Sequence, residues 1–116
     1  MSDLADPQCE CYDPQCRFEA FECTSVGVDE TNGRFGRVEI CRCRRCGRYW
    51  LMYHLEYEHQ ARSGRWYRGL VTREQATSAT PENAVAVLSN LPWYFYGGSY
   101  FGTPAKRGAG PLSLDA

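Results

Sequence analysis

The sequence lacks the features that mark several common classes of protein. No apolar run approaches the roughly 18 residues of a transmembrane helix. Thirteen Lys and Arg residues against 14 Asp and Glu residues give a formal net charge of -1, without the basic excess typical of duplex-DNA-binding proteins. Common enzyme signatures, including the P-loop, G-x-G-x-x-G, H-E-x-x-H and a Ser-His-Asp order, are also missing. We therefore expect no enzymatic activity and no membrane contact, and nucleic-acid binding stays open.

The length and composition indicate one folded domain. A chain of 116 residues has the usual size of a single domain. Hydrophobic residues make up 43% of it and charged residues 23%, which is typical of a folded protein rather than a disordered one. We expect a domain over residues 1–105 and a flexible Gly- and Pro-rich tail over residues 106–116.

Cysteine is the residue type in excess, with seven copies. The segment Met1–Pro7 is acidic and has no apolar stretch, so it does not look like a secretory signal. An odd cysteine count without such a signal predicts reduced thiols in the cytoplasm, where clustered cysteines bind metal more often than they form disulfides. Disulfides in a processed, exported chain are the alternative.

Alternating apolar residues and turn signals predict an antiparallel sheet. Asn32-Gly33 favours a type I′ turn between the first two strands. The strands are expected at residues 17–28, 35–43, 49–58 and 65–71.

Alternation within the third strand assigns its two faces. Leu51, Tyr53, Leu55 and Tyr57 share one face, which we place in the core. The opposite face contains the alternating residues from Trp50 to Glu58, and we expect it to contact solvent.

Two helix-start signals follow the fourth strand. Thr72 and Gln75 fit a capping box, and Thr80-Pro81 places a hydroxyl at an N-cap and proline at the first helical position. We expect one short helix from Pro81 to about residue 90, and a final aromatic strand at residues 93–96. The predicted fold is α+β and mainly antiparallel β: a zinc-ribbon-like β-meander with one short C-terminal helix and a final aromatic strand.

Cys43-x-x-Cys46-Gly47, between two strands, is the most specific motif. Two thiolates at this spacing in a tight turn can bind one Zn²⁺ with bonds of about 2.3 Å. The glycine permits the positive φ that such a turn needs. The motif supplies two of the four ligands of a structural zinc site.

The N-terminal cysteines are the densest source of further ligands. If Thr31 pairs with Arg34, the first strand begins beside the end of the second, so both cysteine groups reach the same end of the sheet. We predict a structural Zn²⁺ held by Cys9, Cys11 and the two cysteines of the turn, Cys43 and Cys46. Cys16 is the first substitute for Cys9.

The same strand register places Cys23 opposite Arg42, on the other face from Cys41 and Cys43. Without a bulge, we expect Cys23 to be a buried structural thiol, whereas Cys41 could replace a weaker ligand. Four thiolates suit iron as well as zinc. A closed site of this kind stabilises a fold and has no open position for catalysis.

The arginines around the predicted metal turn are one candidate binding group. They either contact phosphate or offset the negative charge of the metal centre. They are Arg42, Arg44, Arg45 and Arg48.

Aromatic side chains are the second candidate group. Most must form the core, but residues such as Trp66 and Trp93 could anchor a protein interface. His54, Glu56 and His59 could instead form a catalytic metal site, although a solvated strand face is favoured.

Four segments, Cys43–Leu51, Glu56–Glu58, Ser63–Gly69 and Trp93–Phe101, carry a family resemblance. They resemble small bacterial proteins of zinc-ribbon type, some of which are similar to immunity proteins of interbacterial toxin systems. The resemblance implies a module that neutralises a toxin domain by binding it. Mixed charge and surplus aromatics suit such a protein interface. The alternative is a nucleic-acid-binding zinc ribbon that uses the arginines of the turn.

Overall fold

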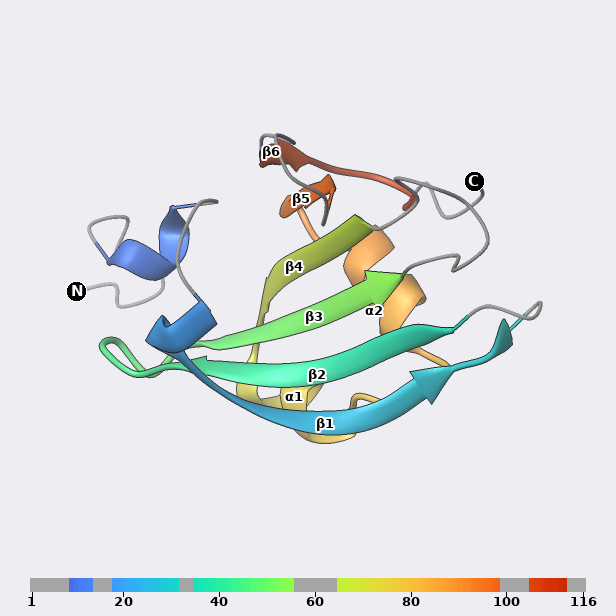
Figure 1. Ribbon diagram of the computed structural model, residues 1–116, viewed down its shortest axis with the longest axis horizontal. Helices are drawn as coiled ribbons and strands as arrows, with labels where there is room; N and C mark the ends of the chain where they lie inside the picture. The colour runs from blue at the N-terminus through green and yellow to red at the C-terminus, as the bar shows by residue number, and fades with distance from the viewer. Residues whose placement is uncertain (1–8, 14–17, 32–34, 56–64, 99–104, 113–116) are drawn as a thin grey trace.

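The computed structural model describes residues 9–13, 18–31, 35–55, 65–98 and 105–112. Within this part of the chain, six antiparallel strands form one sheet in chain order. The strands are β1 (Phe21–Asp29), β2 (Gly36–Cys43), β3 (Tyr49–Leu55), β4 (Arg65–Val71), β5 (Tyr94–Gly98) and β6 (Lys106–Gly108). In the described part of the N-terminal region, the 3₁₀ helices Glu10–Tyr12 and Phe18–Ala20 precede β1. Figure 1 shows this N-terminal segment near the end of the sheet where β2 and β3 are joined. The α+β prediction, mainly antiparallel β, is confirmed.

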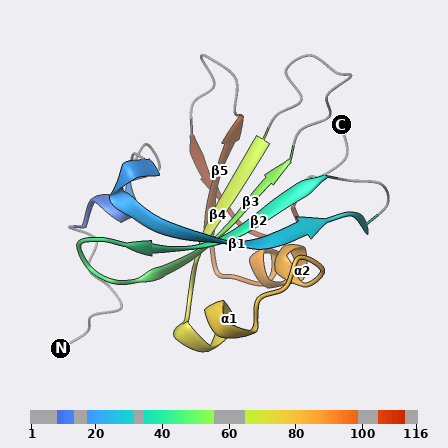
Figure 2. The same cartoon turned by 60° about the horizontal axis from the view of Figure 1, so that its bottom comes forward.

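Two short helices connect β4 to β5, where one was expected. They are α1 (Arg73–Ser78) and α2 (Ala84–Ser89), and Figure 2 shows them on the same side of the sheet. The predicted capping box begins α1: Gln75 N donates to Thr72 Oγ1 at 3.0 Å, and Thr72 N donates to Gln75 Oε1 at 2.8 Å. These bonds satisfy the first amides of a helix that periodicity alone did not indicate. Neither helix in the described segments has the length and apolar character that crossing a membrane requires.

Both faces of the sheet are covered, so the described residues form two apolar cores. The first lies between the sheet and the helices and contains Leu51, Tyr53 and Leu55, as predicted. The second lies on the opposite face, around the fully buried Trp50. The prediction that this face contacts solvent is wrong at Trp50, because N-terminal residues pack on it: the ring of Tyr12 lies 5.8 Å from that of Trp50. Residues 56–64 lie outside the described residues.

A β-bulge in β1 changes the strand register. Near the turn, Val28 pairs with Arg37 and Asp29 with Gly36, which is the predicted register. The register then shifts between Ser25 and Gly27, with Val26 as the extra residue. Beyond the bulge every β1 residue is displaced by one position along β2. The predicted Asn32-Gly33 turn lies outside the described residues.

The first residues of the expected tail form a strand instead. Lys106–Gly108 pair with Tyr94–Tyr96 of β5, and Tyr94 Oη donates to Gly110 O at 2.8 Å. A Cβ on Gly108 would lie 2.9 Å from a ring carbon of Tyr96. Here glycine permits close packing against a tyrosine.

Candidate metal centre

The four predicted ligands lie together at the end of the sheet where β1 begins and β2 ends. All four sulfur atoms are within 4.8 Å of one another. Cys9 Sγ is 3.6 Å from Cys43 Sγ, and Cys11 Sγ is 3.5 Å from Cys46 Sγ. A tetrahedral ion with metal–sulfur bonds of about 2.3 Å requires sulfur–sulfur edges of about 3.8 Å. The four thiols are therefore close enough to hold a metal ion.

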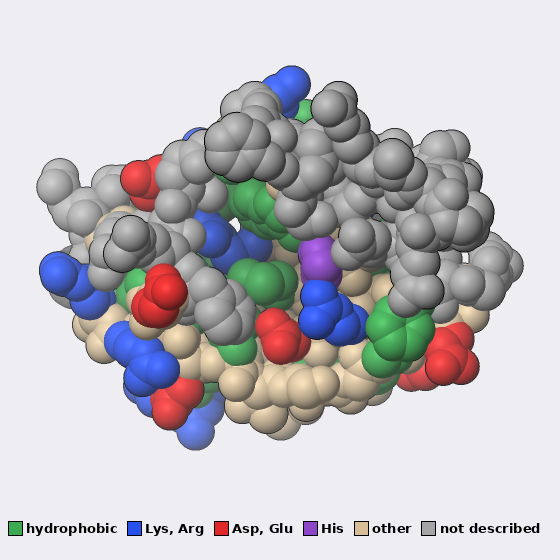
Figure 3. Space-filling model, in the orientation of Figure 1, with side chains coloured by type: hydrophobic (Ala, Val, Ile, Leu, Met, Phe, Trp, Pro, Cys, Tyr) green, Lys and Arg blue, Asp and Glu red, His purple; other side chains and the backbone are tan. Residues whose placement is uncertain are grey.

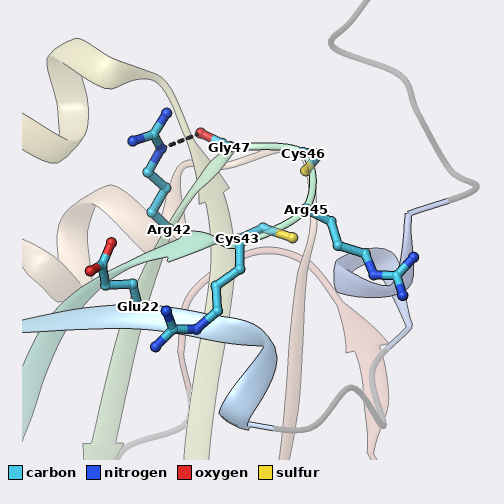
Figure 4. A pocket seen from close by; sticks show the side chains of 7 residues that line it. Glu22, Arg42, Cys43, Arg45, Cys46 and Gly47 are labelled. Carbon is cyan, nitrogen blue, oxygen red and sulfur yellow. Dashed lines mark hydrogen bonds between the residues drawn. The ribbon is translucent and has the colours of Figure 1, made fainter.

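The turn between β2 and β3 positions two of these sulfurs. Gly47 N donates to Cys43 O, and Cys43 N donates to Arg48 O, both at 2.9 Å. Gly47 closes the turn at φ 77°, which favours glycine. Figure 4 shows the sulfurs of Cys43 and Cys46 on the same side of this turn, away from Arg42. The motif thus presents both thiols to one point.

A buried arginine holds the segment that supplies the other two thiols. The side chain of Arg68, in β4, is 3% exposed. Its Nη2 donates to the carbonyl oxygens of Cys11 at 3.3 Å and Asp13 at 3.0 Å. The guanidinium also lies 5.0 to 5.8 Å from the ring centroids of four aromatic residues. They are Trp50, Phe21, Phe95 and Trp66.

Sequence reasoning missed Arg68, although a signal was present. Arg68 lies between Trp66 and Leu70 on one face of the strand, and both of these neighbours are apolar. A charged residue in the middle of such a face indicates a buried charge with a specific partner. Here the partners are the backbone carbonyls of the ligand segment.

The thiols differ in how readily they ionise. Burial opposes ionisation of Cys46, but hydrogen bonds from the backbone and side chain of Arg48, and from Cys11 and Cys9, outweigh it and lower the pKa to about 7. Burial raises the pKa of Cys11, and hydrogen bonds to Cys46 and Cys9 raise it further. Burial likewise raises the pKa of Cys9. Cys46 therefore ionises before Cys11 and Cys9.

The arginines of the turn fall into two groups. Arg48 is half-buried, with its guanidinium 6.0 Å from the ring centroid of Tyr12, and hydrogen-bonds Cys46. Arg42, Arg44 and Arg45 are exposed.

The exposed arginines line a polar pocket of about 420 Å³ (Figure 4). Arg42 Nε donates to Gly47 O at 3.3 Å, and Arg44 Nε donates to Glu19 O at 3.2 Å. Figure 3 shows basic side chains gathered at this end of the sheet, with acidic ones among them.

The two tryptophans predicted to bind a partner are half-buried members of the second core. The ring centroid of Trp93 is 5.1 Å from that of Phe95, and the guanidinium of Arg107 lies 4.4 Å from the Trp93 ring centroid. Trp66 packs beside Arg68. Both therefore have a structural role in covering the metal side of the sheet.

Cys23 and Cys41 are not ligands of this centre. Cys23 pairs with Cys41, not with Arg42 as predicted, because the bulge shifts the register by one residue, and the two form a disulfide. The expectations of a free thiol at Cys23 and a substitute ligand at Cys41 are therefore wrong. Cys16 lies outside the described residues.

Of the alternative catalytic metal site, the structure describes His54 alone. Among the described residues, the groups of three or more candidate ligands are the four cysteines and a second group of Cys23, Glu39 and Cys41. His54 belongs to neither, and its Nδ1 contacts the guanidinium of Arg37. Glu56 and His59 lie outside the described residues.

An apolar groove of about 700 Å³ adjoins the metal turn. Its apolar lining includes Leu70, Val71 and Leu91, and the exposed Arg73 and half-buried Gln75 of α1 also line it. Gly47 and Arg48 of the turn and Tyr49 of β3 line it as well.

Comparison of the chain with protein-family models, curated proteins and solved structures found no match. The interpretation of function therefore rests on the residues and their geometry.

Proposed function

We propose that the protein is a non-enzymatic, Zn²⁺-stabilised protein-binding module. The observation that carries the proposal is the four-thiol centre next to an apolar groove. Four thiolates complete a tetrahedral shell, so the ion would stabilise the fold and activate no water. Zn²⁺ suits such a shell because it prefers tetrahedral sulfur ligands and undergoes no redox change.

The groove supports the choice of a protein as the ligand. A lining that combines apolar side chains with exposed polar ones suits a protein interface. Gly47 and Arg48 belong both to the turn that carries the thiols and to the lining of the groove. A metal that fixes the turn would thereby fix the binding surface. Following the family resemblance, we propose a toxin domain as the partner. The four free thiols favour the cytoplasm as the location, whereas the Cys23–Cys41 disulfide favours the exported alternative.

Metal analysis with thiol counting on protein purified without chelator tests the first half of the proposal. We expect one zinc per chain, lost in the double variant Cys43→Ser/Cys46→Ser together with thermal stability. One iron per chain, with no zinc, would identify the bound metal as iron, which four thiolates also suit. Protein that is folded without any metal would contradict the proposal.

Photo-cross-linking tests the second half. A photoreactive phenylalanine analogue is placed at Arg73, which lines the groove, and as a matched control at Glu82, an exposed position that does not line the groove. In lysate of the source organism, we expect a discrete protein adduct from position 73 and none from position 82. Identical adducts from both positions would contradict binding in the groove.

Nucleic-acid binding is the second candidate function, favoured by the exposed arginines of the polar pocket. Phosphate binding releases counterions, so affinity for a single-stranded oligonucleotide should fall steeply with salt concentration. Arg44→Glu should weaken binding, whereas the control Arg73→Glu, outside the polar pocket, should not. Binding that is insensitive to salt, or no binding in fluorescence anisotropy, would dismiss this candidate.

A further inference from the structure

A second group of ligating side chains lies on the metal-bearing face of the sheet. Cys23 of β1 pairs directly with Cys41 of β2, and their Cα atoms are 4.0 Å apart. Glu39 precedes Cys41 by two positions in the same strand, so its side chain lies on the same face. One ligand atom from each of the three lies within 4.8 Å of the others.

The β-bulge brings this group together. If the register at Val28 and Arg37 continued, Cys23 would stand opposite Arg42 and on the other face from Cys41. The bulge depends on Gly27, whose φ is 136° and where a Cβ would lie 2.8 Å from Pro81 Cγ. The bulge thus places Cys23 directly opposite Cys41.

Accessibility differs between the two sulfurs. Cys41 is fully buried, next to the fully buried Trp50 on β3, whereas Cys23 is only half-buried. A reductant therefore reaches the disulfide from the side of Cys23. After reduction, an ion enters from the same side.

We propose that Cys23, Cys41 and Glu39 form a redox-gated site for a soft divalent cation, separate from the four-thiol centre. A dithiol reductant supplies two electrons and two protons, so the Cys23–Cys41 bond breaks to two thiols while the reductant closes to its own disulfide. A cation such as Zn²⁺ or Cd²⁺ then displaces the two thiol protons and forms two metal–sulfur bonds. Glu39 supplies an oxygen ligand, and the fourth position of a tetrahedral ion stays open to solvent.

This site differs in chemistry from the four-thiol centre. That centre has four thiols and is independent of the disulfide, whereas the second site exists only in the reduced protein. Its occupancy would therefore report the redox state of the surroundings. Three ligands from the protein also leave a position for an external ligand.

The test counts metal ions on the full chain in two redox states. Protein with its disulfide intact, and protein reduced with dithiothreitol and freed of excess reagent under argon, are each incubated with Zn²⁺ and examined by native mass spectrometry. We expect one ion per chain in the oxidised state and two in the reduced state. Equal ion counts in both states would overturn the proposal.

Three variants assign the second ion. Cys23→Ser should bind one ion fewer than the reduced wild type, and Thr24→Ala, a control at the exposed neighbouring position of β1, should bind as many. Glu39→Gln should weaken the second ion by at least about tenfold, since even indirect partners of metal ligands contribute that much. A second ion that persists in Cys23→Ser would overturn the proposal, and failure of the four-thiol centre would instead remove one ion from both redox states.

Discussion

At the scale of single residues, side chains outside the four thiols support the proposed metal centre. Arg68 ties the segment of Cys9 and Cys11 to the sheet through two backbone carbonyls, and Arg48 hydrogen-bonds Cys46. Both carry positive charge next to a group of thiols that becomes negative when it binds a metal. Arg68 holds the segment that carries two of the thiols, and Arg48 favours the ionised form of Cys46.

Replacing Arg68 should weaken metal binding. Arg68→Met removes the donor of two hydrogen bonds and loosens the ligand segment, so we expect affinity to fall by about 10- to 100-fold. Arg68→Lys keeps the charge but cannot reproduce the planar fork, and should recover only part of the affinity. Competition with a chromophoric chelator measures both, with circular dichroism as a check of folding. Unchanged affinity in Arg68→Met would contradict this role.

Cys46 should be more reactive than Cys9 and Cys11 in metal-free protein. The thiolate is the nucleophile, and the pKa of Cys46 is lowered to about 7 while that of Cys11 is raised. Alkylation by iodoacetamide should therefore rise with pH to half its maximum near pH 7 at Cys46, well before Cys11 reacts. Peptide mapping by mass spectrometry measures this. Arg48→Met should move the midpoint to higher pH, and earlier modification of Cys11 would refute the assignment.

At the scale of elements, β1 and β2 decide which cysteines can meet. Their hairpin places the start of β1 beside the end of β2, with Phe21 opposite Cys43. The bulge then selects Cys41 as the partner of Cys23. One irregularity in a strand thereby separates the disulfide pair from the metal ligands.

Gly27→Ala should destabilise the protein through this bulge. A Cβ would add a collision with Pro81 to a backbone conformation that side chains rarely adopt, and such strain costs about 1–3 kcal/mol. Gly110→Ala is the matched control, because Gly110 also has a positive φ of 86° but nothing lies within 4 Å of its Cβ position. Urea denaturation should give a larger loss of unfolding free energy for Gly27→Ala. Equal losses would show that contact with Pro81 is unimportant.

At the scale of the whole molecule, the two cores differ in the segments that cover them. Helices α1 and α2 cover one face of the sheet. On the other face, the N-terminal ligand segment packs against Trp50, Phe95 and Trp93. We expect a metal to stabilise the second core, because it would link this segment to the turn between β2 and β3.

Metal removal should therefore expose Trp50 and lower the melting temperature. Protons compete with the metal for thiolates, so stabilisation by the metal should be present at neutral pH and decrease as the pH falls. Tryptophan fluorescence and thermal melts, with and without chelator, measure both effects. The chelator should have a large effect at neutral pH and little at mildly acidic pH. An identical melting temperature with and without chelator at neutral pH would contradict the link.

Local patterns in the sequence were sufficient for the first four strands and for the turn that carries two of the four clustered thiols. Alternation predicted the core face of β3, the capping box marked the start of α1, and Cys43-x-x-Cys46-Gly47 predicted the turn that carries two thiols. Each depends on residues within one strand or turn, where spacing fixes which side chains share a face. The N-terminal pair Cys9 and Cys11 followed from the hairpin register.

Only the tertiary structure decided which cysteines pair and which face is buried. The Cys23–Cys41 disulfide depends on a bulge at Gly27 that packs against Pro81, and the burial of Trp50 depends on Tyr12. These partners are far apart in the sequence, so the spacing of apolar and polar residues within one element cannot predict that they touch. Pairing and burial follow from the packing of distant segments, whereas strands and turns follow from the chemistry of neighbouring residues.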